Sequence, residues 1–213
     1  MKKPFDLNAP YQPATFAFPD KDVVTEIISR YPEGKQQSAV MPLLDLAQRL
    51  MGETGATSNP VFGGWIPRAA MDTIAETLGM PKTKVYEVAT FYSMYNLAPV
   101  GKFLVQVCAT SPCWLCGSDK IRKACESKLG IHAGETTKDG MFTLVEVECL
   151  GACVNAPMAQ INDDFYEDLT EARTIEIIDA LASGKQVPAG PQNGRTGSMA
   201  LSGATTLTDR VKA

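Results

Sequence analysis

Apolar residues recur at helical spacing through the first half of the chain. Between residues 20 and 31 these positions are three to four residues apart, which places them on one helix face: Val23, Val24, Ile27 and Ile28. The same spacing predicts three further helices, at about 36–51, 67–79 and 81–93. We therefore expect a helical bundle over residues 20–97, preceded by a proline-rich irregular arm over residues 1–19.

The pattern changes after Pro99, where short apolar runs alternate with amphipathic stretches. Strands are predicted at 103–107, 142–147, 158–161 and 165–167, and helices at 118–129 and 171–183. This order predicts a small α/β domain over residues 98–185. Residues 186–213 are rich in Gly, Pro, Ser and Thr and predict an extended or disordered tail. The chain as a whole is expected to be α+β.

Composition narrows the possible functions. Hydrophobic residues make up 45% of the 213 residues and charged residues 21%, which is ordinary for a globular protein. The formal net charge of -4 argues against nucleic acid as a partner, because phosphate binding needs clustered Lys and Arg. No apolar run approaches the roughly 20 residues that span a bilayer, and we expect a cytosolic location. Six cysteines in that reducing compartment indicate metal or redox chemistry rather than disulfides.

Four of the cysteines form two pairs at equivalent places. Cys108 and Cys113 follow the first predicted strand, and Cys149 and Cys153 follow the second. If these strands are neighbours in one sheet, both loops meet at the same edge and four thiolates converge. Soft sulfur ligands select zinc, copper(I) or iron–sulfur clusters, and the spacing alone leaves zinc and iron–sulfur open.

A different ligand set is also compatible with the spacing. Cys108, Cys113 and Cys116 read C-x4-C-x2-C, the plant-type ferredoxin pattern, and Cys149 could supply the fourth ligand. That assignment leaves Cys153 without a role. The remaining Cys125 lies inside a predicted helix, where a buried cysteine acts as a small hydrophobe.

Longer stretches around these loops carry a family resemblance. The segments VCATSPCWL at 107–115 and EVECLGACVNAPM at 146–158 strongly resemble the 24-kDa [2Fe-2S] subunit of respiratory complex I. The segments ATFYSM at 89–94 and GPQNGR at 190–195 are similar to the same family. The resemblance covers nearly the whole chain, with one departure: Cys116 stands where the family commonly has Arg.

The resemblance implies a thioredoxin-like domain whose [2Fe-2S] ligands are Cys108, Cys113, Cys149 and Cys153. It also implies an electron-transfer subunit of the proton-translocating NADH:quinone oxidoreductase that is not catalytic alone. The partner would be the subunit that binds NADH and FMN, and the complex would lie on the cytoplasmic side of a bacterial inner membrane. Rival interpretations are a soluble NAD-linked formate dehydrogenase or hydrogenase subunit, a free-standing ferredoxin, or a zinc-stabilised interaction module.

Three further features yield expectations. A helix that begins near Gly117 could direct its N-terminal dipole at the site. Lys120, Arg122 and Lys123 form a basic patch on that helix, either simply solvated or used for docking. His132 is the sole histidine, so a Rieske centre, which needs two, is excluded, and we expect a surface position.

Overall fold

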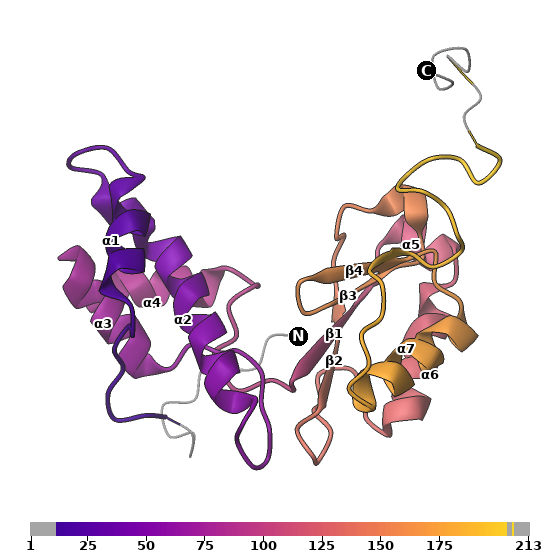
Figure 1. Cartoon of the computed structure of the whole chain (residues 1–213), viewed down its shortest axis with the longest axis horizontal. Helices are drawn as coiled ribbons and strands as arrows, with labels where there is room; N and C mark the ends of the chain where they lie inside the picture. The colour runs from indigo at the N-terminus through magenta and orange to yellow at the C-terminus, as the bar shows by residue number, and fades with distance from the viewer. Residues whose placement is uncertain (1–11, 204–205, 207–213) are drawn as a thin grey trace. The chain divides into compact units, whose positions relative to one another are not determined.

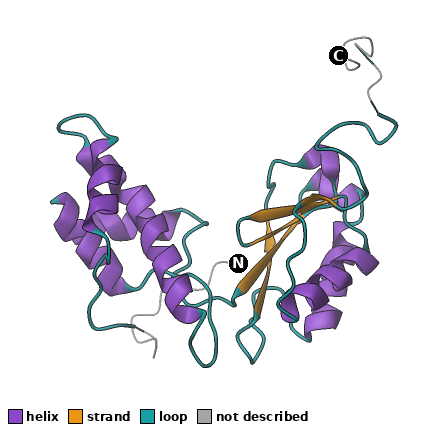
Figure 2. Ribbon diagram, viewed as in Figure 1, coloured by secondary structure: helices purple, strands orange, loops and turns teal. Residues whose placement is uncertain are grey.

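The computed structural model describes residues 12–203 and 206. The described chain divides into two compact units, a helical unit over 12–102 with 138–141 and a mixed unit over 103–137 and 142–203 (Figure 1). Figure 2 shows that the strands belong to the mixed unit. The α+β fold class is therefore confirmed, while the domain boundaries 20–97 and 98–185 stay a prediction.

The helical unit contains the four expected helices. They are α1 Lys21–Ser29, α2 Val40–Gly55, α3 Arg68–Leu78 and α4 Lys82–Phe91, with a short 3-10 turn, η1 Gln36–Ala39, before α2. Asp20 caps α1 by accepting hydrogen bonds from the N–H groups of Asp22 and Val23. The apolar faces meet in one core, whose fully buried members include Leu43, Leu44, Ile74 and Val85. The periodicity of the sequence thus reports burial at most of these positions, but Val23, which was assigned to the inner face of α1, is 38% exposed.

Helix α2 runs four residues beyond its predicted end near residue 51. The extra turn holds Gly52 and Gly55, whose low helix propensity favours an earlier end. A Cβ on Gly55 would lie 2.2 Å from the Phe62 carbonyl oxygen, so glycine is needed for the returning chain to pack against the helix. The helix continues because this packing offsets the low helix propensity of glycine.

The mixed unit is a five-stranded sheet with the order β2-β1-β3-β4-β5. Its strands are β1 Phe103–Cys108, β2 Phe142–Val147, β3 Ala159–Ile161, β4 Asp164–Glu167 and β5 Gly190–Pro191. Its helices are α5 Ser111–Leu115, α6 Ser118–Leu129 and α7 Glu171–Ala182, with a 3-10 turn, η2 Cys153–Asn155, before β3. Strands β1 and β2 pair in parallel, which requires a crossover, and α6 supplies it.

Three elements of this unit were not predicted: helix α5, the 3-10 turn η2 and strand β5. Helix α5 lies where a cysteine loop was expected. It was not predicted because five residues are too few to show a helical period. Strand β5 lies in the predicted tail, where Gly190 pairs with Tyr166 of β4. After β5 the described tail is a series of turns as far as residue 203 and not simply extended. Residues 204–205 and 207–213 lie outside the described chain, as does most of the N-terminal arm. Among the described helices, none is both long and apolar enough to span a membrane.

Candidate metal centre

Parallel pairing of β1 and β2 brings the two cysteine loops to one edge of the sheet. Cys108, the last residue of β1, lies opposite Val147, the last residue of β2. The Ala109 N–H donates a hydrogen bond to the Val147 carbonyl oxygen at 3.0 Å, which extends the pairing into the loops. The predicted convergence of the loops therefore follows from the strand register.

The first loop buries its two thiols. Cys108 and Cys113 are each only 1% exposed, and both pack against the buried side chain of Met158. Cys113 lies on α5, which starts at Ser111 immediately after the Thr110 cap residue. The floor of the site is thus apolar and closed to solvent.

The second loop presents its two thiols at the surface. Cys149 and Cys153 are exposed, and their sulfur atoms are 3.4 Å apart. Between them Gly151 has φ +86°, a left-handed conformation that suits glycine, and its N–H lies 3.4 Å from the Cys149 sulfur. The loop therefore curls around its own sulfur atoms.

The pKa values of the two buried thiols shift in opposite directions. Burial would raise the pKa of Cys108, but the Thr110 hydroxyl, 3.5 Å away, and the N–H groups of Thr110 and Leu150 lower the pKa below its ordinary value. Burial and the hydrogen bond to Cys108 raise the pKa of Cys113 to about 12, against the lowering effect of the Met158 N–H. Thiolate character therefore concentrates on Cys108.

The exposed pair shows the same division. The Gly151 N–H, the Cys153 thiol and the Thr110 hydroxyl lower the pKa of Cys149. The hydrogen bond to Cys149 raises the pKa of Cys153. The charge of Cys108 acts on both of these thiols, so the two loops form one electrostatic site. A bound metal group would displace the remaining protons, since thiolates are the ligands.

The other two cysteines differ from these four. Cys116 is exposed at the end of α5, and its side chain makes no hydrogen bond within the described residues. Cys125 is fully buried in α6, and burial raises the pKa of its thiol to about 12. The prediction of a buried, inert Cys125 agrees with this position, and the role of Cys116 stays open.

The donor set suits a binuclear iron–sulfur group. Four soft sulfur donors come from two loops, with an apolar floor and several N–H groups directed at sulfur. Four cysteine thiolates are the usual ligand set of a [2Fe-2S] cluster, so the residues present fit such a cluster.

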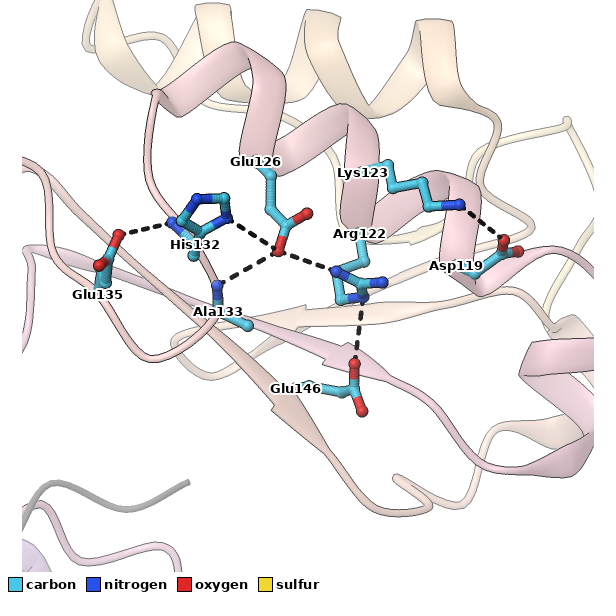
Figure 3. Close-up of polar contacts among 8 residues, drawn as sticks. All are labelled: Asp119, Arg122, Lys123, Glu126, His132, Ala133, Glu135 and Glu146. Carbon is cyan, nitrogen blue, oxygen red and sulfur yellow. Dashed lines mark hydrogen bonds and ion pairs between the residues drawn. The ribbon is translucent and has the colours of Figure 1, made fainter.

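The basic patch on α6 is largely paired. Figure 3 shows Arg122 between Glu126 of the same helix, at 2.9 Å, and Glu146 of β2, at 3.2 Å. Lys123 pairs with Asp119 at 3.6 Å. Arg122 and Lys123 are thus held in pairs within the chain, and the choice between a solvated face and a docking patch stays open. The side chain of His132 is 85% exposed, which confirms its predicted surface position.

Several groups that act on sulfur escaped sequence analysis. The sequence could have indicated the Thr110 hydroxyl, because Thr110 lies two residues after Cys108. It gave no indication of the N–H groups of Leu150 and Met158. The N-terminus of α6 was also expected to act on the site, and this stays a prediction; Cys113 lies inside the short helix α5, five residues before α6 begins at Ser118. The Ala156–Pro157 peptide bond that precedes Met158 is cis.

Comparison with known proteins identifies the class. The chain belongs to the thioredoxin-like [2Fe-2S] ferredoxin family, whose model matches residues 24–182. It is 54% identical to an NADH-quinone oxidoreductase subunit of Rickettsia typhi over 167 residues, which cover 78% of this chain and 92% of that protein. It is 49% identical to the mitochondrial NADH dehydrogenase [ubiquinone] flavoprotein 2 of Dictyostelium discoideum over 200 residues, 94% of this chain and 76% of that protein.

A solved structure of an enzyme shares the fold. The NAD+-reducing [NiFe]-hydrogenase in the H2-reduced state matches 57% of this chain and 21% of its own, with a TM-score of 0.51 and 20% identity. At that identity the match supports the fold alone.

Proposed function

We propose that this chain is the [2Fe-2S] electron-transfer subunit of NADH-quinone oxidoreductase, the respiratory complex I, with Cys108, Cys113, Cys149 and Cys153 as the cluster ligands. The observation that carries the proposal is the convergence of these four thiols in a chain 54% identical to the Rickettsia typhi subunit over 92% of that protein's length. When bound, a [2Fe-2S] cluster accepts and releases single electrons.

Hydrogen-bond donors around the four cysteines stabilise negative charge on their sulfur atoms. The N–H groups of Leu150, Gly151 and Met158 and the hydroxyl of Thr110 donate to the sulfur atoms. Donors of this kind stabilise thiolates and favour the reduced state of an iron–sulfur centre. Buried Met158 excludes water from one side, while the exposed Cys149 and Cys153 leave the other side open to a partner.

The partner that we propose is the NADH- and FMN-binding flavoprotein subunit. A hydride carries two electrons and an iron–sulfur centre takes one, so a flavin must lie between NADH and this site. Three large apolar side chains beside the cysteine loops support docking here: Trp114 is 62% exposed, Leu115 76% and Val154 69%. The family resemblance implies that the assembly lies on the cytoplasmic side of a bacterial inner membrane.

Cysteine replacements test the ligand set. Iron, zinc and acid-labile sulfide are measured on the purified chain and on single Ser variants of Cys108, Cys113, Cys149 and Cys153, with Cys116→Ser as the matched control. We expect two irons and two sulfides per wild-type chain, lost in the four variants and kept in the control. Zinc without sulfide would overturn the cluster, and loss in Cys116→Ser with retention in Cys153→Ser would establish the plant-type ligand set instead.

Co-purification tests the partner. A tagged chain from cells should bring down a flavoprotein together with membrane-bound subunits of the quinone reductase. Recovery with a soluble formate dehydrogenase or hydrogenase would favour that rival function instead. Recovery of the chain alone with a full cluster would indicate a free-standing ferredoxin.

A further inference from the structure

The segment after α7 is tied to the mixed unit by side chains as well as by β5. The Gln192 N–H donates to the Glu167 carbonyl oxygen at 2.9 Å, and the Gln192 side chain accepts a hydrogen bond from Arg173 at 3.0 Å. The side-chain oxygen of Asn193 then accepts a hydrogen bond from the backbone N–H of Arg195 at 3.0 Å, which closes a turn. These contacts fix the point from which the Arg195 side chain extends.

Arg195 reaches the residues that directly follow Cys153. Its Nη1 donates to the side-chain oxygen of Asn155 at 3.2 Å and lies 3.4 Å from the carbonyl oxygen of Val154. Its Nη2 pairs with Asp168 at 2.7 Å. The side chains of Arg195 and Asp168 are 16% and 7% exposed, so this is a largely but not fully buried ion pair beside a proposed ligand loop.

Asn155 joins the loop and the tail in a second way. It is 2% exposed, and its side-chain amide donates to Glu167 and to the carbonyl oxygen of Gly197, the latter at 3.0 Å. Its own carbonyl accepts the N–H of Asp168 at 2.8 Å. The backbone after Cys153 is therefore held by the tail on one side and by the end of β4 on the other.

Removal of either charge from such an ion pair strongly changes the electrostatic potential around it. The planar guanidinium of Arg195 binds several oxygens at fixed angles, which a lysine cannot reproduce. Removing one charge leaves the other uncompensated at low dielectric. Within the described residues, the Asp168 Oδ2 and Arg195 Nε atoms have no hydrogen-bond partner, so little else would neutralise the charge that remains.

We infer that Arg195 is a positioning residue of the iron–sulfur site, and that the Arg195–Asp168 pair sets the charge near the second cysteine loop. The segment from Gly190 to Gly197 is then part of the site and not only an extended tail. The inference rests on the proposed function, because Cys149 and Cys153 must be cluster ligands for the pair to act on them. It predicts opposite effects for the two charges, since a cation favours the reduced, more negative state and an anion opposes it.

The test measures the midpoint potential and electron paramagnetic resonance spectrum of the reconstituted full chain. At the wild-type midpoint potential, Arg195→Gln should lower the ratio of reduced to oxidised cluster by about threefold to tenfold. Asp168→Asn should raise this ratio by a similar factor. Both changes are of the size expected when one partly screened unit charge is removed. For this one-electron couple, tenfold equals about 59 mV. Arg195→Lys keeps the positive charge but loses the planar guanidinium, so we expect a near-normal midpoint potential with an altered electron paramagnetic resonance spectrum.

Arg173→Gln is the matched control, because the Arg173 side chain also contacts the tail but directs its hydrogen bonds at Gln192 and Glu176 and not at the cysteine loop. A second measurement uses the cluster-free chain: amide hydrogen exchange at Asp168, whose N–H is bonded to Asn155, should speed up in Arg195→Gln and not in Arg173→Gln. This measurement decides the positioning role even if Arg195→Gln fails to retain a cluster.

The outcomes separate this inference from the proposed function. If the wild-type chain holds a [2Fe-2S] cluster but Arg195→Gln and Asp168→Asn shift the potential in the same direction, or no more than Arg173→Gln does, the inference is overturned while the function stands. If the wild-type chain binds no sulfide, both are overturned. Shifts of opposite sign, with faster exchange at Asp168, support the inference.

Discussion

The phenol of Tyr95 should make the helical unit sensitive to alkali. Only 2% of this residue is exposed, and its hydroxyl donates a hydrogen bond to the Met41 carbonyl oxygen at 2.9 Å. Burial, followed by the charges of Asp45, Tyr92 and Tyr31, raises the pKa of Tyr95 from 10.0 to about 12. We predict that Tyr95→Phe is less stable than the wild type at neutral pH and less sensitive to high pH.

The magnitude follows from the two states of the phenol. At pH 7 the variant loses one hydrogen bond, a cost of about 1 kcal/mol. Above pH 10 the phenol ionises in the unfolded chain but stays protonated in the folded chain until about pH 12, so the unfolded state binds fewer protons and wild-type stability falls as pH rises. The loss from this group is about 1.4 kcal/mol by pH 11. Phe cannot ionise, so the order of stability should reverse near pH 11.

Urea unfolding of the two cluster-free chains, followed by circular dichroism from pH 7 to pH 11, measures this difference directly. The range from pH 7 to pH 9 is an internal control, because neither state of the phenol ionises there and the difference should stay constant. A difference that remains constant up to pH 11 would refute the reasoning, since it would mean that burial does not hold the phenol protonated.

Three further substitutions have defined outcomes. Thr110→Val removes a hydroxyl 3.5 Å from the Cys108 sulfur and should lower the potential of the cluster by the equivalent of about 1 kcal/mol, measured by redox titration. Gly55→Ala places a methyl group 2.2 Å from the Phe62 carbonyl oxygen and should destabilise the chain by about 1–3 kcal/mol in urea unfolding. Asp20→Ala removes the cap of α1 and should cost about 1 kcal/mol by the same assay.

Each of these has a matched control. Thr110→Ser keeps the hydroxyl and should keep the potential; equal shifts in Ser and Val would contradict a role for the hydrogen bond. Glu53→Ala changes an exposed position of the same helix as Gly55, and an equal loss in both variants would show that packing against Phe62 is not the cause. Asp20→Asn keeps a capping side chain, so the capping account would fail if Asn and Ala were equally destabilising.

The long periodic elements could be predicted from the sequence because their patterns are local. Residues 118–129 and 142–147 are helix and strand with the predicted bounds, since apolar spacing over a dozen residues or over an alternating run reports the face that is buried. Helix α5 and strand β5 are too short for any period to appear. The extension of α2 depends on the packing of Phe62 against Gly55, a contact made by the loop after the helix that apolar spacing does not report.

The sequence by itself determined that two cysteine pairs follow two strands, and the flanking segments were specific enough to indicate the family. Only the tertiary structure decided that Cys108 is buried and Cys149 exposed, and that the N–H of Met158 is directed at sulfur. The same holds for Arg195, 40 residues from Asn155 along the chain and 3.2 Å from it in space. Periodicity reports which side of an element is buried, but contacts between distant segments depend on the path of the whole chain.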